Sequence, residues 1–318
     1  MLLTDNIKKQ GILIPDRMGK PRADQMIGTW AECLSELCGR ICYDSLGKGR
    51  SSAEYHAHVL EVGHLSVYEH PHVTVEVVVP PHMLSDCLLA CLNKPALRVR
   101  RGDGDTLRIT MNLRHMIEWD DQAMPTRFNV IPRSVLRSVA PQIDARLAAP
   151  RNMSLYDYTL VGPETDTETY LSYLMVGSRG FSHEQVRHGD WSAISQRSTR
   201  YCDEDTTPYV THPLLQEYLD TGGTGYLRQV IKESMTADRH TYRCVVKELD
   251  SWLRVVKKLD AGTARKQARG AARGYLGNAL ETELIFTASA AQWHHMERLR
   301  LHPAADREIN DIYARLDL

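Results

Sequence analysis

Residues 187–201 read RHGDWSAISQRSTRY, a polar stretch with three arginines, three serines, a threonine, a histidine and a glutamine. Such a stretch is too polar for a hydrophobic core. If residues 195–201 are extended, Gln196, Ser198 and Arg200 face one way. Their amide, hydroxyl and guanidinium then form a cradle for an anion, because arginine binds phosphate through paired, charge-assisted hydrogen bonds. The alternative is a solvated arginine loop, since most charged runs are solvated faces.

The composition of the whole chain excludes several classes of partner. The chain has 318 residues, of which 42% are hydrophobic and 25% charged, so a core of normal size is possible. Its net charge is -1, which offers no general attraction for nucleic acid or an anionic membrane. The N-terminal residues do not resemble a signal peptide, and no run approaches the roughly eighteen apolar residues of a membrane helix. We therefore expect a cytoplasmic protein without nucleic-acid or membrane partners.

The cysteines favour a reducing compartment. There are seven, an odd number, and no C-x-x-C pair. Cys33, Cys38 and Cys42 follow one another closely, so a metal site with the later histidines is conceivable. Zinc ligands normally come in tighter pairs, and the spacing equally suits small buried residues on one helix. We predict no metal.

Hydrophobic periodicity predicts mixed helices and strands. Helices are expected over 29–45, 227–256, 263–273 and 288–300, strands over 73–79 and 170–178, and a hairpin over 96–111 with its turn at 102–105. The apolar stripe of 227–256 is expected to be core. No internal repeat stands out. This alternation indicates an α/β or α+β domain.

Three separated blocks resemble one known family. SRGFSHEQVRHG (178–189) with SQRSTRY (195–201) is similar to the signature RHR-x-x-S-x-N-E-x-S-x-R-Y of the flavin-dependent thymidylate synthases, with Ser195-Gln196 as the SQ variant. CYDS (42–45) with GHLSVYEHPHVTVEV (63–77), and AARGYLGNALETELIFTASAAQWHHMERLR (271–300), look like two further blocks of that family. Three blocks in the right order are far more specific than one motif.

The resemblance implies a fold, a chemistry and an assembly. It implies a single domain over residues 1–318, with a central, mostly antiparallel sheet flanked by long helices. It implies transfer of a one-carbon unit from methylenetetrahydrofolate to C5 of dUMP, with NADPH-reduced FAD as the hydride source and no catalytic cysteine. Family members are homotetramers whose active sites lie between subunits, so a homotetramer is expected here.

The resemblance also assigns residues by their place in the motifs. Three match positions at the flavin and folate side: His64, Ser66 and Glu69. Four more match flavin contacts: Arg187, His188, Ser289 and His295. Six match positions around the nucleotide: Glu184, Gln196, Ser198, Arg200, Arg273 and Arg300. Arg300 is expected to face the uracil, where a guanidinium stabilises negative charge that develops on the ring, and Ser198 and His64 complete the predicted catalytic set.

The sequence departs from the family at the cofactor and sugar side. The third arginine of RHR is missing, with Gly189 or Asp190 in its place. Glu184 stands where many members have glutamine, and a carboxylate suits ribose hydroxyls better than phosphate. Ser289 and Ala291 replace an asparagine and an arginine that commonly contact FAD. Residues 80–168 form an insertion, within which NLRHMIEW (112–119) echoes a helix near the C-terminus of some members.

These departures favour a specialised relative. We interpret the chain as a flavin-dependent C5-methylase of dUMP, UMP or both, of the kind that supplies 5-methyluridine-type units for nucleoside antibiotics. One alternative is an ordinary dUMP-specific thymidylate synthase. Another is a non-catalytic flavin or nucleotide binder.

Overall fold

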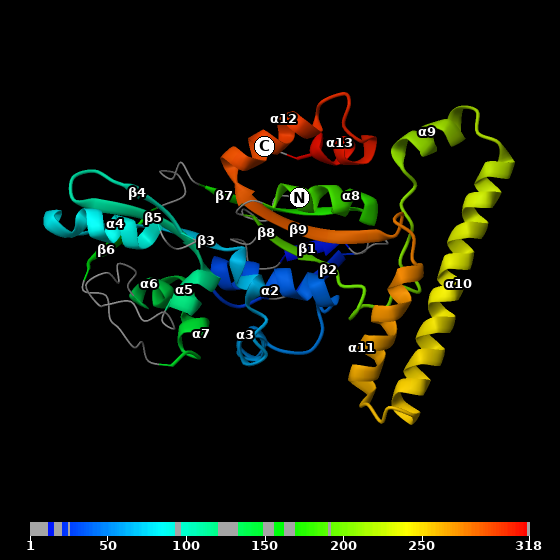
Figure 1. Cartoon of the computed structure of the whole chain (residues 1–318), viewed down its shortest axis with the longest axis horizontal. Coiled ribbons are helices and arrows are strands. Elements are labelled where there is room, and N and C mark those ends of the chain that lie inside the picture. Colours follow the sequence, from blue (N-terminus) through cyan, green and yellow to red (C-terminus); the bar gives the residue numbers. More distant parts are fainter. Residues whose placement is uncertain are drawn as a thin grey trace.

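The computed structural model describes residues 12–15, 21–24, 26–92, 97–119, 133–148, 156–161, 169–189 and 192–316, with only the backbone of 12–15 and 21–24. The described strands pair in antiparallel fashion and helices cover the sheets, which confirms the α/β (α+β) class (Figure 1). The strands divide between a pair β1-β2, a sheet of order β4-β5-β3-β6 and a sheet of order β7-β9-β8. The pair consists of β1 (Ile12–Pro15) and β2 (Pro21–Asp24).

The four-stranded sheet contains the predicted valine strand and the predicted hairpin. Its strands are β3 (His72–Val78), β4 (Leu97–Arg101), β5 (Thr106–Asn112) and β6 (Tyr158–Leu160). Val73, Val75 and Val77 are buried, as strict alternation predicts for a strand with one face on the core. The tight turn between β4 and β5 uses Gly104, whose φ of +61° favours glycine.

The three-stranded sheet carries the motif residues. It is built from β7 (Tyr170–Ser178), β8 (Ala193–Gln196) and β9 (Glu281–Ser289). The extended segment of the motif therefore ends at Gln196, and the prediction that it reaches Tyr201 is wrong, because residues 199–201 form a turn. Residues 281–289, for which the periodicity predicts no strand, form a strand with both faces buried.

Helices cover both faces of the three-stranded sheet (Figure 1). On one face lies α2 (Trp30–Tyr43), which begins with a capping box between Thr29 and Glu32. On the other lie α8 (Arg179–Gln185), α12 (Ala290–Arg300) and α13 (Arg307–Tyr313), around the buried Trp293. Leu174 and Ile285 pack with the residues of the four-stranded sheet in one hydrophobic cluster, so both sheets share a core.

Shorter helices complete the N-terminal half. These are α3 (Ser52–Glu61), η1 (Leu65–Glu69), η2 (Pro81–Met83), α4 (Leu84–Leu92), α5 (Leu113–Trp119), α6 (Arg133–Val139) and α7 (Pro141–Asp144). Cys33, Cys38, Cys87 and Cys91 are buried in the core. Within the described residues, no three His, Cys, Asp or Glu side chains gather as metal ligands would.

A helical hairpin projects from the sheets at the right of Figure 1. It consists of α9 (Pro213–Thr221), α10 (Gly225–Val255), α11 (Ala261–Ala272) and η5 (Arg273–Tyr275). The prediction that the stripe of α10 is core is wrong: of its residues only Tyr242 and Leu253 are buried. The partner helix α11 is much shorter, so it covers little of the stripe. None of the helices in the described part of the chain has both the length and the apolar character needed to cross a membrane.

Candidate active site

Arg300 is the centre of a polar cluster between α8 and α12. Its Nη1 lies 2.7 Å from Oε2 of Glu184, and its Nε donates to Nε2 of His188 over 2.8 Å. The Arg300 side chain is 16% exposed and that of Glu184 is 32% exposed. Three residues that the sequence assigns to the pocket thus meet although Arg300 is more than a hundred residues from the other two.

The geometry fixes the protonation of His188. Because Arg300 donates to its Nε2, that nitrogen must be the unprotonated one. Partial burial, followed by the neighbouring Arg300 and His295, lowers the pKa of His188. Its backbone carbonyl accepts a hydrogen bond from Nε2 of Gln292, 2.8 Å away, which holds the turn against α12. A neutral histidine therefore sits beside the guanidinium.

Gln196 joins this cluster to strand β9. Its Nε2 donates to Oγ of Ser182 over 2.9 Å and to Oγ1 of Thr282 over 3.1 Å. Ser182 lies on the same helix, α8, as Glu184. The amide is therefore positioned by α8 and β9 together. Asp190 lies outside the described residues.

The residues after β8 lie beside α2 and α11. The backbone N–H of Ser198 donates to the carbonyl of Cys42 over 2.9 Å, and its Oγ accepts from the N–H of Arg200. Arg200 is exposed beside Gly270 of α11, three residues before Arg273, which is also exposed. The two predicted phosphate-binding arginines are therefore at the same end of α11. Arg197 instead faces inward and binds Glu204 at 2.9 Å.

His64 borders a separate cavity of about 740 Å³. Its Nδ1 lies 3.0 Å from the hydroxyl of Tyr43, and the Tyr43 ring meets Tyr201 edge to face at 4.8 Å. Burial raises the pKa of Tyr43 to about 12, so its hydroxyl stays protonated. Tyr43 belongs to the CYDS block but was not among the predicted site residues. Besides His64, this cavity has four basic side chains on its wall: Arg40, Lys48, Arg50 and His58.

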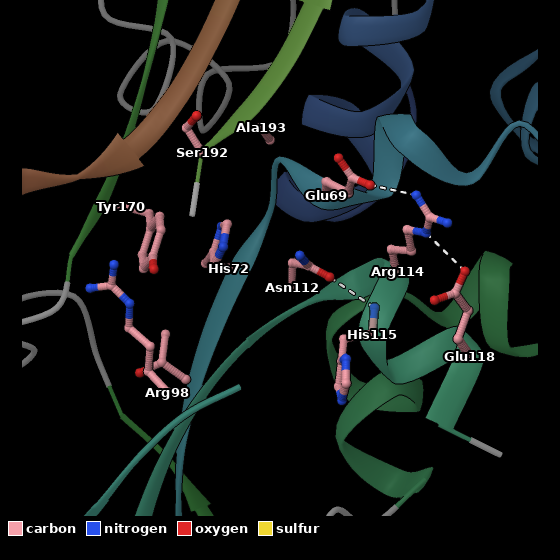
Figure 2. Close-up of a pocket in the computed structure, with 11 residues that line it drawn as sticks. Glu69, His72, Arg98, Asn112, Arg114, His115, Glu118, Tyr170, Ser192 and Ala193 are labelled. Atoms are coloured by element: carbon pink, nitrogen blue, oxygen red, sulfur yellow. Dashed lines mark hydrogen bonds and ion pairs between the residues drawn. The ribbon is translucent and has the colours of Figure 1, made fainter. Parts of the chain in front are cut away.

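Glu69 lines a second, smaller cavity of about 280 Å³, shown in Figure 2. Its Oε1 is 2.5 Å from Nη1 of Arg114, and Nε of Arg114 lies 2.8 Å from Oε1 of Glu118. Ser66, on the same short helix η1, is exposed. Arg114 belongs to the NLRHMIEW stretch. A residue of the predicted insertion therefore forms an ion pair with Glu69, a predicted flavin-side residue.

The predicted residues thus fall into groups rather than one pocket. Glu184, His188 and Arg300 are in contact, with the exposed His295 on the same helix as Arg300, and Arg187 is exposed beside them. Ser289 is different: its side chain is buried, and its Oγ accepts from the N–H of Gln292 to cap α12. The His64 and Glu69 cavities are lined by other residues.

Comparison with known proteins agrees with the C-terminal half of this arrangement. Residues 167–316 match the family model described as thymidylate synthase complementing protein. Flavin-dependent thymidylate synthases of Mycobacterium tuberculosis (strain ATCC 25618 / H37Rv) and Mycobacterium avium (strain 104) are each 34% identical over 140 residues. That of Mycolicibacterium vanbaalenii is 33% identical over the same length. Each alignment covers 44% of this chain and 52% of the relative, so the chain spans about half the length of these relatives.

Proposed function

We propose that this chain is a flavin-dependent C5-methylase of uridylate, because residues 167–316 match the family model described as thymidylate synthase complementing protein. One-carbon transfer would use methylenetetrahydrofolate, and FAD reduced by NADPH would supply the hydride. The observation that carries the proposal is the contact of Glu184, His188 and Arg300. We also propose that residues 1–318 form a single domain, in which residues 80–168 are an insertion.

Arg300 is the proposed catalytic residue. Its guanidinium is mostly withdrawn from water, where a positive charge stabilises developing negative charge more strongly than in bulk solvent. Negative charge develops on the pyrimidine ring as C5 becomes nucleophilic. The neutral His188 adds no charge beside Arg300, and the ion pair with Glu184 orients the guanidinium. Ser198 and His64 remain the other proposed members of the catalytic set.

Arg200 and Arg273 are the proposed phosphate ligands. Both are exposed and lie at the same end of α11, so their guanidinium groups are accessible to a nucleotide. Gln196 is the proposed contact nearer the sugar. Arginine suits this role because its planar fork donates two parallel hydrogen bonds to a phosphate.

The residues assigned to the flavin fit a phosphate-bearing cofactor in part. Arg187 is exposed on η4 (Val186–His188), and His295 is exposed on α12, so both side chains are accessible. Ser66 is accessible in the same way, and Glu69 lies beside Arg114 in a cavity. Ser289 supports the start of α12 instead of reaching a ligand. Bound flavin would supply the hydride, and the protein side chains would bind and orient it.

Glu184 supports UMP as a substrate beside dUMP. One of its carboxylate oxygens binds Arg300, and the side chain stays 32% exposed. A carboxylate is an acceptor only, so it can bind ribose hydroxyls but not a phosphate. UMP has one more ribose hydroxyl than dUMP to offer it. A product of this kind suits nucleoside-antibiotic biosynthesis.

The exposed stripe of α10 supports a homotetramer. Tyr226, Val230, Trp252, Val255 and Val256 are exposed large hydrophobic residues on or next to this helix. Exposed large hydrophobic residues at both ends of one helix are unusual on a monomer and support an interaction surface there. Assembly through it would also bring the separate groups of predicted site residues from different chains together.

Tritium release tests the activity and the substrate together. The purified chain is incubated with C5-labelled UMP or dUMP in the presence of FAD, NADPH and methylenetetrahydrofolate. We expect release from both nucleotides. Release from dUMP alone would favour the ordinary thymidylate synthase, and release from neither, in a protein that binds flavin, would favour the non-catalytic binder.

An arginine pair on α12 gives a matched control. Arg300→Ala should lower turnover by roughly 10²- to 10³-fold, as removal of one preorganised donor to a transition state does. Arg298→Ala removes an exposed arginine from the same helical turn and should leave turnover unchanged. Circular dichroism should show both variants folded. Equal turnover in the two variants would exclude Arg300 as the catalytic residue.

A further inference from the structure

Two parts of the chain, residues 72–119 and 170–300, repeat one architecture that the sequence did not reveal. In each, a strand leads into a helix, a second strand follows, and a third strand pairs with both before a last helix. The first set is β3, α4, β4, β5 and α5, and the second is β7, α8, β8, β9 and α12. The third strand is central in both, in the orders β3-β5-β4 and β7-β9-β8. The hairpin α9–α11 occupies the place of the tight turn between β4 and β5.

The strand registers align the two repeats residue by residue. His72 pairs with Asn112 at the end of β5, and Tyr170 pairs with Ser289 at the end of β9. Asn112 and Ser289 do the same work, since each accepts a hydrogen bond from the N–H three residues later, at 2.8 Å and 3.3 Å. The two helices that follow therefore start at equivalent positions.

A second pair of contacts supports the alignment. Two residues further into the strands, Thr74 bonds to Thr110 through their hydroxyls at 2.9 Å. The equivalent residues of the second repeat, Ser172 and Thr287, bond through their hydroxyls at 2.7 Å. A hydroxyl pair buried at the same register position in both sheets is a specific agreement, which hydrophobic patterning alone does not require.

Equivalent residues of the two repeats meet each other. The rings of His72 and Tyr170 stack in parallel, with centroids 3.5 Å apart and planes 3° apart. Contact between equivalent positions is what a local two-fold axis produces. The cavity beside Glu69 lies at this junction, and its wall comes from both repeats (Figure 2).

At two equivalent positions the repeats differ in charge. Arg98 pairs with Thr110 on β5, and Ala193 pairs with Thr287 on β9, so Arg98 and Ala193 are equivalent. By the same alignment, Arg114 on α5 is equivalent to Ala291 on α12. The first repeat thus carries arginine where the second carries alanine. Both arginines line the cavity.

The two arginines have different surroundings. Arg114 lies between the carboxylates of Glu69 and Glu118, which neutralise it. Arg98 lies over the ring of Tyr170, 5.5 Å from its centroid, and no carboxylate of the described residues forms an ion pair with it. Its charge is therefore available to an anion that enters the cavity.

We propose that this cavity binds the phosphate-bearing part of the flavin, with Arg98 as the cation that replaces the arginine missing from the turn after His188. The inference rests on the proposed function. Ser192 and Ala193, which follow that turn directly, line the same cavity as Arg98, so the replacement reaches the site from the other repeat. Glu69, a predicted flavin-side residue, lies on the same wall.

Flavin titrations test the assignment without turnover. The wild-type chain, Arg98→Ala, Arg98→Lys and Arg100→Ala are each titrated with FAD, FMN and riboflavin, and binding is followed by flavin fluorescence. Arg98→Ala should weaken FAD and FMN roughly ten- to hundredfold, the range for loss of a charged hydrogen-bond partner, and leave riboflavin unchanged. Arg98→Lys should retain part of the affinity. Arg100, on the same strand but outside the cavity, is the control and should not matter.

The outcomes separate this inference from the proposed function. A wild-type chain that binds none of the three flavins contradicts both. A wild-type chain that binds FAD, with an Arg98→Ala variant of equal affinity, contradicts only the assignment of Arg98. Equal weakening of FAD and riboflavin in a folded Arg98→Ala protein would also overturn it, because riboflavin has no phosphate.

Discussion

His70 links three elements of the motif region and should make the fold sensitive to acid. It is fully buried, its Nδ1 lies 2.8 Å from Oγ1 of Thr287 on β9, and its Nε2 lies 2.9 Å from Oγ of Ser195 on β8. Burial, with His72 as a lesser cause, lowers the pKa of His70 from 6.5 to about 3. As the pH falls below 6.5, the unfolded chain binds a proton at this ring and the folded chain does not. The contribution of His70 to the free energy of unfolding is therefore fully present above the pKa of the unfolded chain. It is lost as the pH falls from that value towards the pKa of the folded chain.

The expected size follows from the two pKa values. Between pH 7 and pH 5 this one histidine should remove about 2 kcal/mol from the free energy of unfolding. His70→Gln keeps a donor and an acceptor for the two hydroxyls but cannot titrate. Its free energy of unfolding should therefore fall by about 2 kcal/mol less than that of the wild type over this range.

Urea unfolding at pH 7, 6 and 5 measures this difference. His82→Gln, which changes an exposed histidine outside the core, serves as the control and should show the wild-type dependence on pH. Proton uptake by the other buried histidines on unfolding contributes to the pH dependence of every variant alike. This contribution therefore cancels when the variants are compared. An identical pH dependence for His70→Gln and the wild type would refute the reasoning.

Three further changes test packing, electrostatics and assembly. Gly39→Ala should lower the free energy of unfolding by about 1–3 kcal/mol in urea, because a methyl group there would collide with the hydroxyl of Tyr55. Arg197→Ala should cost about 3–5 kcal/mol in the same assay, since it leaves the buried Glu204 without its cation. Trp252→Asp should reduce the mass seen by light scattering while circular dichroism stays unchanged, because this 45% exposed ring lies on the proposed interface. A tetrameric Trp252→Asp protein would move the interface elsewhere.

Local patterns were predictable where one face of an element is buried. Strand β7 has the predicted bounds, and β3 and the β4–β5 hairpin were expected from their valines and glycines. Strand β9 was missed because both its faces are buried, so it shows no alternation. The stripe on α10 was correctly read as apolar and wrongly placed in the core, because periodicity does not distinguish a core from an interface.

The sequence predicted three residues that are in contact around Arg300, but it did not predict how the candidate site residues group in space. The motif resemblance selected Glu184, His188 and Arg300, which meet in space. It gave no signal for Arg98, whose neighbours come from a different repeat and depend on strand register. The sequence did not reveal the repeat, because equivalent residues have the same structural role, such as capping a helix, but are often different amino acids. Asn112 and Ser289 illustrate this point.

The structural repeat bears on whether the missing third arginine of the RHR motif indicates a non-catalytic relative or a rearranged enzyme. If the cofactor side had decayed in a non-catalytic relative, the losses at Gly189, Ser289 and Ala291 should have no counterpart elsewhere. Instead the other repeat places Arg98, whose charge is available to an anion, beside the cavity at the position equivalent to Ala193. The ion pair of Arg300 with Glu184 meanwhile joins α8 and α12. If Arg98 supplies the proposed flavin contact and Arg300 the proposed catalytic one, the chain is a rearranged enzyme and not a binder that has lost its chemistry.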